Sequence, residues 1–275
     1  MMSNFKGVWS SELRAKKRLG QHFLQPEWAD KLVDVIIPGP EDRFVEIGPG
    51  PGALTLRLAP RVAHVTAIEV DAEMIATLRP LVRPNVTLVE ADFLAAPIAP
   101  LFEGPLPVRV AGNLPYNISS PILFRLIDAH LRYRSIRDAT LMLQREVAER
   151  IEASPGTKDY GVLSISVQLH ADVTRLLSLP PGAFRPAPRV HSSVLRLAFR
   201  PPAVEVSDPL LFEQMVRAMF TQRRKTLGNA LRPFAVARGA HAAEALRRAG
   251  IDPIRRPETL QLDELARLAE FFTAG

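Results

Sequence analysis

The sequence GNLPYNISSP, residues 112–121, decides how the rest of the chain is interpreted. The apolar run before it, residues 106–111, predicts a strand, and the run after it, residues 122–127, predicts a helix. Ser119 or Ser120 is suited to cap that helix, with a proline in its first turn. The motif therefore lies at the carboxyl end of a strand, where open α/β sheets bind ligands.

Four consecutive residues of this stretch are suited to bind a planar amino group: Asn113, Leu114, Pro115 and Tyr116. Asn113 offers a side-chain carbonyl oxygen, and Leu114 offers a backbone carbonyl in a segment that the following proline keeps extended. Pro115 adds no competing donor, and Tyr116 supplies a flat face for the ring that carries the amino group. Two acceptors on its hydrogens push the nitrogen towards tetrahedral geometry. The alternative is a proline-containing turn with an asparagine cap and a core tyrosine.

A short apolar run and a glycine-rich loop upstream predict the first turn of a nucleotide-binding βαβ unit. Residues 44–47 read as a buried strand, GPGPG follows at 48–52, and helical periodicity begins at Ala53. The spacing departs from the dinucleotide pattern, because Ala53 stands where its last glycine belongs. Three residues of this loop lack a Cβ atom and so allow the backbone to approach a ligand closely: Gly48, Gly50 and Gly52.

Acidic residues end the next two predicted strands. The strand 65–68 ends at Glu69, about 20 residues after the loop, where a ribose-binding acid belongs; the alternative is a solvated strand end. The strand 86–89 exits at Asp92, which is placed to accept from an adenine amino group unless it caps a loop. Four successive strands thus offer polar side chains at the same end: Glu46, Glu69, Asp92 and Asn113. That coincidence predicts a Rossmann-like ligand edge.

The loop 180–190 is stiffened by prolines and presents one aromatic residue, Phe184, between arginines. Phe184 could hold a base from the face opposite Tyr116; the alternative is a rigid crossover with Phe184 buried. The other elements that periodicity predicts before residue 200 are strands at 138–143, 173–179 and 193–199, and helices at 26–36, 53–58, 72–81, 144–152 and 161–170.

A proline-containing boundary at residues 200–209 divides the chain, and only helical periodicity follows it. We therefore predict an α/β domain of residues 1–200, with residues 1–15 as a mobile arm, and a small all-α domain of residues 201–275. The helices predicted in the second domain are 211–220, 226–231, 242–249 and 262–272.

Composition narrows the class of protein. The chain of 275 residues has no cysteine, which excludes disulfides and thiolate metal sites, and its six histidines are scattered. No apolar run reaches the length of a membrane span, and residues 1–4 open no secretory signal. We expect a cytosolic, metal-independent monomer.

The net charge of +6 and the pI of about 10.0 are modest, but the basic residues are clustered. Such clusters are the electrostatic footprint of a polyanion-binding protein, although a basic pI alone often means only a solvated surface. The two clusters that we assign to RNA are Lys16, Lys17, Arg18 and Arg223, Arg224, Lys225, and Arg185 and Arg189 of the loop 180–190 join them.

The sequence resembles the small-subunit ribosomal RNA adenine dimethyltransferase family (KsgA/RsmA) over nearly its whole length. The motifs that carry this resemblance are LGQHFL at 19–24, VEIGPGPGALT at 45–55, IEVD at 68–71, residues 112–121, FRPAPRV at 184–190 and RRKTL at 223–227. The resemblance implies a Rossmann-like class I methyltransferase sheet with a helical RNA-binding domain. It also implies transfer of methyl groups from S-adenosylmethionine to the N6 atoms of two adjacent adenosines in a small-subunit rRNA hairpin, and a role in ribosome assembly on immature subunits.

By the same resemblance, His22 and Leu24 close over the cofactor, and residues 48–52 lie along its methionine part. Glu69 takes the ribose hydroxyls and Asp92 the adenine. The Asn113 side chain and the Leu114 carbonyl hold the target nitrogen, while Tyr116 and Phe184 sandwich the flipped adenine. Two positions depart from the family pattern: His22, where asparagine is common, and Gly228, where relatives carry a basic or polar residue.

Three other functions share part of this pattern. Adenine methylation of large-subunit rRNA or of DNA would use the same Asn-x-Pro-Tyr grip. A non-catalytic assembly factor could retain the fold, although the intact Glu69, Asn113 and Tyr116 argue against it. A nicotinamide oxidoreductase fits the glycine loop and fails at Ala53 and at the Asn-Leu-Pro-Tyr motif.

Overall fold

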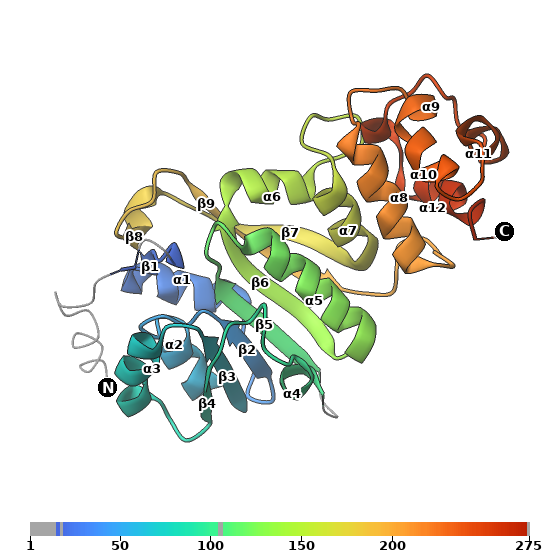
Figure 1. Cartoon of the computed structure of the whole chain (residues 1–275). Helices are drawn as coiled ribbons and strands as arrows, with labels where there is room; N and C mark the ends of the chain where they lie inside the picture. Colours follow the sequence, from blue (N-terminus) through green and yellow to red (C-terminus); the bar gives the residue numbers. More distant parts are fainter. Residues whose placement is uncertain (1–14, 17–18, 104–106, 274–275) are drawn as a thin grey trace. The chain divides into compact units, whose positions relative to one another are not determined.

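The protein is described by a computed structural model that covers residues 15–16, 19–103 and 107–273 (Figure 1). Its contacts divide the chain into two compact units. The first unit runs to Ala148 and includes Thr174–Phe199, and the second joins Glu149–Val173 to the residues from Arg200 onward. The chain thus crosses into the second unit for Glu149–Val173 before the boundary predicted at residue 200. Apart from Ala15, the predicted arm of residues 1–15 lies outside the described residues.

The first unit is built on a mixed sheet with the order β4-β3-β2-β5-β6-β9-β7. The strands from β4 to β6 run parallel, and β9 returns antiparallel to β6. Each predicted strand is confirmed to within a few residues. Their bounds are β2 Arg43–Ile47, β3 His64–Glu69, β4 Val86–Glu90, β5 Val108–Asn113, β6 Ile136–Gln144, β7 Ala171–Leu179 and β9 Ser192–Phe199.

The strand order places a topological switch point between β2 and β5. From β2 the chain builds outward through β3 and β4, and it then returns to the other side of β2 as β5. Ligands bind at such a point, outside the carboxyl ends of the strands, because the connections there leave in opposite directions. The two strands that flank the switch point end in the glycine loop and in Asn113.

The helices of the first unit follow the predicted pattern with one correction and one addition, α4, which was not predicted. The helix α5 begins at Ser119 itself, so its cap is Ile118, which makes no side-chain cap bond. The prediction that Ser119 or Ser120 caps it is wrong; the Ser119 hydroxyl instead donates to the Tyr116 carbonyl at 3.2 Å. The bounds are α1 Pro26–Ile36, α2 Thr55–Leu58, α3 Ala72–Leu78, α4 Ala99–Phe102, α5 Ser119–Tyr133 and α6 Arg145–Glu152, with 3-10 turns at Ala59–Arg61 and Arg79–Leu81.

One face of the sheet packs against α1 and α2. Side chains alternate along each strand, so Phe44 of β2 reaches this core and Val45 does not. On the helix side, the periodic apolar residues of α1 meet those of α2. The members of this core include Leu32, Ile36, Phe44, Leu58, Val65, Ala111, Met142 and Val194.

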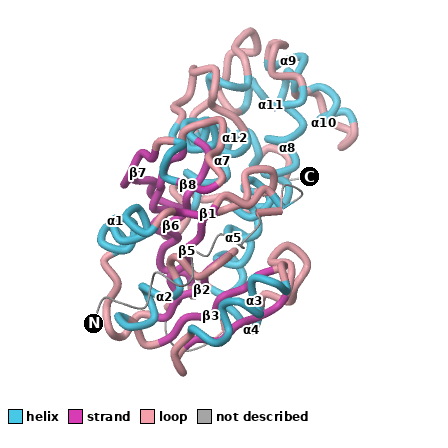
Figure 2. Tube along the Cα trace, turned by 90° about the vertical axis from the view of Figure 1, so that its left-hand side faces the viewer, coloured by secondary structure: helices cyan, strands magenta, loops and turns pink. Residues whose placement is uncertain are grey.

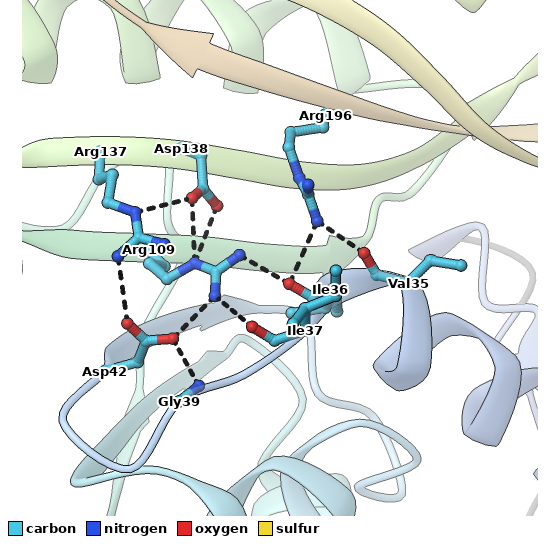
Figure 3. A network of polar contacts seen from close by, with 9 residues as sticks. All are labelled: Val35, Ile36, Ile37, Gly39, Asp42, Arg109, Arg137, Asp138 and Arg196. Atoms are coloured by element: carbon cyan, nitrogen blue, oxygen red, sulfur yellow. Dashed lines mark hydrogen bonds and ion pairs between the residues drawn. The ribbon is translucent and has the colours of Figure 1, made fainter.

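A buried network of charged side chains fixes the carboxyl end of α1 (Figure 3). The last carbonyls of a helix lack partners inside it, and Ile37 closes this one with a left-handed φ of 54°. Arg109 of β5, which is 3% exposed, donates to the carbonyls of Ile36 and Ile37 at 2.8 and 3.1 Å. The same guanidinium binds Asp138 at 3.0 Å and Asp42 at 2.7 Å, so its charge is compensated. No periodicity in the sequence reveals this network.

The second unit has its own hydrophobic core, and its described residues from 200 onward form only helices and loops (Figure 2). Arg223 ties its basic segment to the loop before α7 by donating to the Thr157 carbonyl at 3.0 Å. The predicted helix 226–231 is confirmed as α9, whose caps are Thr226 and Leu231, and a helix that was not predicted, α10, begins directly after it with Pro233 in its first turn. The bounds are α7 Val162–His170, α8 Pro209–Thr221, α9 Leu227–Ala230, α10 Arg232–Val236, α11 Ala242–Arg248 and α12 Leu262–Glu270, with a 3-10 turn at Pro257–Thr259.

Candidate functional site

A cavity of about 240 Å³ opens at the switch point of the first unit. It brings together the polar residues that the sequence singled out at four strand ends, Glu46, Glu69, Asp92 and Asn113. The lining also includes a segment that we call the N-terminal strap, residues 19–24. The remaining contributors are residues 46–51, 53–54, 68–70, 91–94 and 113–118, with Ile122.

Only part of the glycine loop faces this cavity. Gly48 and Gly50 line it, with φ angles of 68° and 53°. Gly52 does not line it, although it was predicted to bind the cofactor. It is buried with φ at 89°, and a Cβ atom there would lie 2.4 Å from the Leu78 side chain. The third glycine therefore allows α3 to pack against the loop.

Glu69 ends β3 and lies under the glycine loop. It is 7% exposed, so the alternative of a solvated strand end does not hold. One carboxylate oxygen accepts from the Gly50 amide at 3.1 Å and the other from the Asp71 amide at 3.0 Å. Burial raises the pKa of Glu69 above its usual range. A carboxylate has about four acceptor sites, so Glu69 can still accept from a ligand.

Glu46 lies deeper, at 1% exposure. The Thr55 hydroxyl, in the first turn of α2, donates to it at 2.6 Å. Burial raises the pKa of Glu46 to about 7, because a charged carboxylate is poorly solvated there.

Asp92 lies at the cavity and also caps a turn, as the two alternatives for it predicted. It lines the cavity after β4, and one of its oxygens accepts from the Leu94 amide at 2.9 Å. This bond caps the turn, as the structural alternative expected. The side chain is exposed, so its other oxygen is available to a donor in the cavity.

Asn113 is held in one orientation. Its side-chain nitrogen donates to the His22 carbonyl at 2.8 Å, which leaves the side-chain oxygen as an acceptor. The next residue, Leu114, is anchored by its amide, which donates to the Met142 carbonyl at 3.2 Å, and by a buried side chain. Pro115 lines the cavity beside them. The strand end thus offers acceptor oxygen at the switch point.

Tyr116 presents an aromatic ring beside these acceptors. Its hydroxyl and that of Ser192 share a hydrogen bond of 2.7 Å, and burial raises the pKa of Tyr116, so the phenol stays neutral. The His22 ring stacks on the ring of Tyr116, with centroids 5.5 Å apart and planes 24° from parallel. Both residues line the cavity.

The N-terminal strap is pinned to the rest of the first unit at both ends. The strand β1, Phe23–Leu24, pairs antiparallel with β8, Phe184–Arg185, and the buried Leu24 lines the cavity. Just before the strap, the Lys16 ammonium contacts Asp71 at 2.8 Å and Glu73 at 2.9 Å. Lys16 was predicted to meet RNA, but the structure engages it in these ion pairs. Lys17 and Arg18 lie outside the described residues.

Phe184 is not at the cavity. Its side chain is 1% exposed and belongs to the core that α1 and α2 form with the sheet. The predicted sandwich with Tyr116 is therefore corrected: the alternative of a crossover with Phe184 buried is what the structure has. Pairing of β8 with β1 turns this ring inward, whereas Arg185 and Arg189 of the same loop are exposed.

Sequence reasoning missed two apolar residues of the lining. Val70 and Phe93 each follow a predicted acid at a strand end, and both line the cavity. Val70 remains 52% exposed. An apolar residue directly after an acid at the carboxyl end of a strand is the signal that could have identified them, because such a position faces the ligand edge.

The basic residues 223–225 of the second unit differ in their exposure and in their contacts. Arg224 and Lys225 are exposed, whereas Arg223 also lies 3.8 Å from the Glu258 carboxylate. In the described ranges no group of acidic and histidine side chains could hold a metal ion. Among the same residues, no helix is both long and apolar enough to cross a bilayer.

Comparison with known proteins gives a consistent result. The family model described as "Ribosomal RNA adenine dimethylase" matches residues 12–274. The chain is 44% identical over 269 residues to the ribosomal RNA small subunit methyltransferase A of Geobacter metallireducens, covering 95% of this chain and 97% of that one. It is 45% identical to the protein of the same name from an Anaeromyxobacter strain, over 94% and 93% of the two chains.

Two solved structures share the fold. A dimethyladenosine transferase from Plasmodium falciparum superposes with a TM-score of 0.75 at 24% identity, covering 92% of this chain and 98% of that one. The 23S rRNA methyltransferase ErmE superposes with a TM-score of 0.62 at 27% identity, covering 91% and 99%. The match to the family model over nearly the whole chain, together with these relatives, means that the chain belongs to the ribosomal RNA adenine dimethylase family.

Proposed function

We propose that this protein transfers methyl groups from S-adenosylmethionine to the N6 atoms of two adjacent adenosines in a small-subunit rRNA hairpin. The observation that carries the proposal is the fixed amide of Asn113, whose oxygen is left as an acceptor by the bond to His22. Family membership supports adenine in ribosomal RNA as the target, and the names of the 44–45% identical relatives support the small subunit.

The lining of the cavity fits the proposed cofactor. S-adenosylmethionine is rich in donors, with ribose hydroxyls, two amino groups and a cationic sulfur. The described lining contains three acidic residues, Glu46, Glu69 and Asp92, and no lysine or arginine. Glu69 and Asp92 would accept from the ribose and the adenine, and Val70 and Phe93 would contact the base. His22, Leu24, Gly48 and Gly50 would close over the remainder.

Methyl transfer from this cofactor requires that the protein position the reactants, and it requires no reactive side chain. When bound, the cofactor supplies a methyl group already activated on a sulfonium. Asn113 and the Leu114 carbonyl would accept the two N6 hydrogens, and Tyr116 would stack on the adenine ring. Holding the reacting atoms in line can contribute several kcal/mol. Fixed polar groups of this kind are worth roughly 3–4 kcal/mol each.

RNA would be bound through phosphate contacts from exposed cations. Arg224 and Lys225 of the second unit are exposed, and so is Lys158, whose neighbour Thr157 is held by Arg223. Sequence reasoning did not include Lys158, because it lies 65 residues before Arg223 in the chain. In the first unit, Arg185 and Arg189 are candidates for the same role.

Several finer statements belong to the same proposal. We infer that the substrate is an immature small ribosomal subunit, that the protein acts as a monomer in the cytoplasm, and that it assists subunit assembly. A second candidate, methylation of large-subunit rRNA, has in its favour the likeness to ErmE at 27% identity. The higher identity to relatives named for the small subunit favours the first.

Mapping the product would test the proposal. Immature small subunits, large subunits and duplex DNA are each incubated with labelled S-adenosylmethionine, and dimethyladenosine is located by mass spectrometry. We expect two adjacent dimethylated adenosines in the small-subunit RNA only. Label in large-subunit RNA or DNA instead would favour the rival substrates, and label in none of the three would favour a non-catalytic assembly factor.

A further inference from the structure

The imidazole of His22 is held in the cavity by two contacts that do not involve the cofactor. Its Nδ1 atom lies 2.7 Å from the Pro186 carbonyl oxygen. A carbonyl can only accept, so this nitrogen carries the hydrogen. The face of the ring stacks on Tyr116. The ring therefore connects the N-terminal strap to the Asn-Leu-Pro-Tyr motif and to the loop after β8.

The hydrogen bond to Ser192 cannot by itself orient the Tyr116 ring. The phenolic oxygen lies on the axis about which the ring turns, so rotation leaves the hydroxyl in place while the faces tilt. A flat partner against one face removes that freedom. His22 is such a partner, and its bond to Pro186 keeps it from swinging away.

We infer that His22 is a positioning residue for the target base, which sets the tilt of Tyr116 through its ring and the orientation of Asn113 through its backbone carbonyl. The inference rests on the proposed function, in which Tyr116 stacks on the target adenine. At a centroid separation of 5.5 Å no base fits between the two rings, so the adenine stacks on the other face of Tyr116. Phe184 is buried in the core, which leaves His22 as the aromatic partner of Tyr116 among the residues that the structure describes.

The test uses two variants that keep the backbone carbonyl. His22→Asn removes the ring and keeps a donor for Pro186, whereas His22→Phe keeps the ring face and removes the donor. In single-turnover methylation, His22→Asn should slow turnover about 3- to 10-fold, the scale of an aromatic pair. His22→Phe should recover most of that loss. S-adenosylmethionine is kept saturating for every variant, at concentrations set by calorimetry, because His22 also lines the cofactor cavity.

A double-variant cycle with Tyr116→Ala separates this inference from the proposed function. If His22 acts through Tyr116, His22→Asn should have no further effect in the Tyr116→Ala background. Additive losses, or unchanged turnover in His22→Asn, would each overturn the inference. If Tyr116→Ala itself keeps wild-type turnover, the stacking role of Tyr116 fails and the inference fails with it, whereas the proposed function would fail only if the wild type transferred no methyl group.

Discussion

Among the carboxylates of the site, Glu46 has the pKa that burial raises most. Its pKa of about 7 in the folded protein lies above the 4.5 of a free glutamate, so the folded state binds this proton more tightly. Its contribution to the free energy of unfolding is therefore full below about pH 4.5 and is lost as the pH rises to about 7. The loss is on the order of 3 kcal/mol. Glu46→Gln should be more stable than the wild type at pH 8.

Urea unfolding at pH 5 and at pH 8 would measure this difference. The substitution keeps an acceptor for Thr55, so a gain in stability would come from the removed ionisation. An identical pH dependence for Glu46→Gln and wild type would mean that Glu46 ionises freely in the folded state.

Glu69 is expected to bind the cofactor ribose. Glu69→Ala should weaken S-adenosylmethionine binding by about 1–3 kcal/mol, because the hydroxyls lose a charged acceptor. Glu90 is the matched control: it pairs in register with Glu69 on β4 but does not line the cavity. Calorimetry should find Glu90→Ala unchanged, and an unchanged Glu69→Ala would remove this residue from the site.

The location of some site residues could be predicted from the sequence, and that of others could not. Asn113, Glu69 and Asp92 could be placed at one cavity because strand ends in a parallel sheet share an edge. Phe184 could not, because a two-residue strand carries no periodicity that shows which way its ring turns. The partner of Lys16, Asp71, lies 55 residues away, and no local pattern pairs them. The functions assigned to these residues stay predictions until they are measured.

At the scale of elements, the network at the end of α1 makes a testable contribution to stability. Arg109→Ala would leave the buried Asp138 with only the exposed Arg137, at 3.4 Å, and would remove the Arg109 donor from the Ile37 carbonyl, while Ile36 keeps a bond from Arg196. Breaking a buried pair in this way typically costs about 3–5 kcal/mol. Arg61→Ala is the control, since its ion pair with Asp34 at 3.3 Å is exposed and worth at most about 1 kcal/mol. Equal urea midpoints for the two variants would contradict the structural role of Arg109.

Most elements were predictable because their apolar residues repeat with the period of a strand or a helix. The helix at residues 26–36 agrees with the structure at both ends, since Pro26 can open a helix and Pro38 stops it. The pair β1 and β8 was not predicted, because two residues are too few for a period. The start of α5 was misjudged because serine is favourable both as a cap and within the first turn.

At the scale of the whole molecule, RNA affinity should depend on salt through the exposed cations. Replacing Arg224 and Lys225 by alanine should reduce the log–log salt slope by about 1 per lost phosphate contact. Arg223 is left intact because it holds Thr157. Replacing Arg79 and Arg83 removes the same charge from exposed sites of the first unit and should leave the slope unchanged. An unchanged slope in the Arg224 and Lys225 variant would exclude this surface from RNA binding.

The fold class followed from the sequence, but the division into units did not follow completely. The alternation of strands and helices predicted the sheet, and the loss of strand signals after residue 200 predicted a helical second part. The segment Glu149–Val173 was missed because Ile165 and Leu169 of α7 pack with Met215 and Leu268, which are more than 40 residues away in sequence. Local periodicity gives the helix but not its partners.

The central claim is that Asn113 grips the target amino group, and single-turnover methylation by Asn113→Ala tests it most directly. With cofactor and subunits saturating, turnover should fall roughly 10²–10³-fold, the effect of deleting one preorganised polar group. RNA affinity should be retained, because phosphate contacts dominate it, and cofactor affinity should fall only slightly. Both are measured alongside. Near-wild-type turnover would mean that another residue positions the adenine, and the proposed role of the switch-point site would be contradicted.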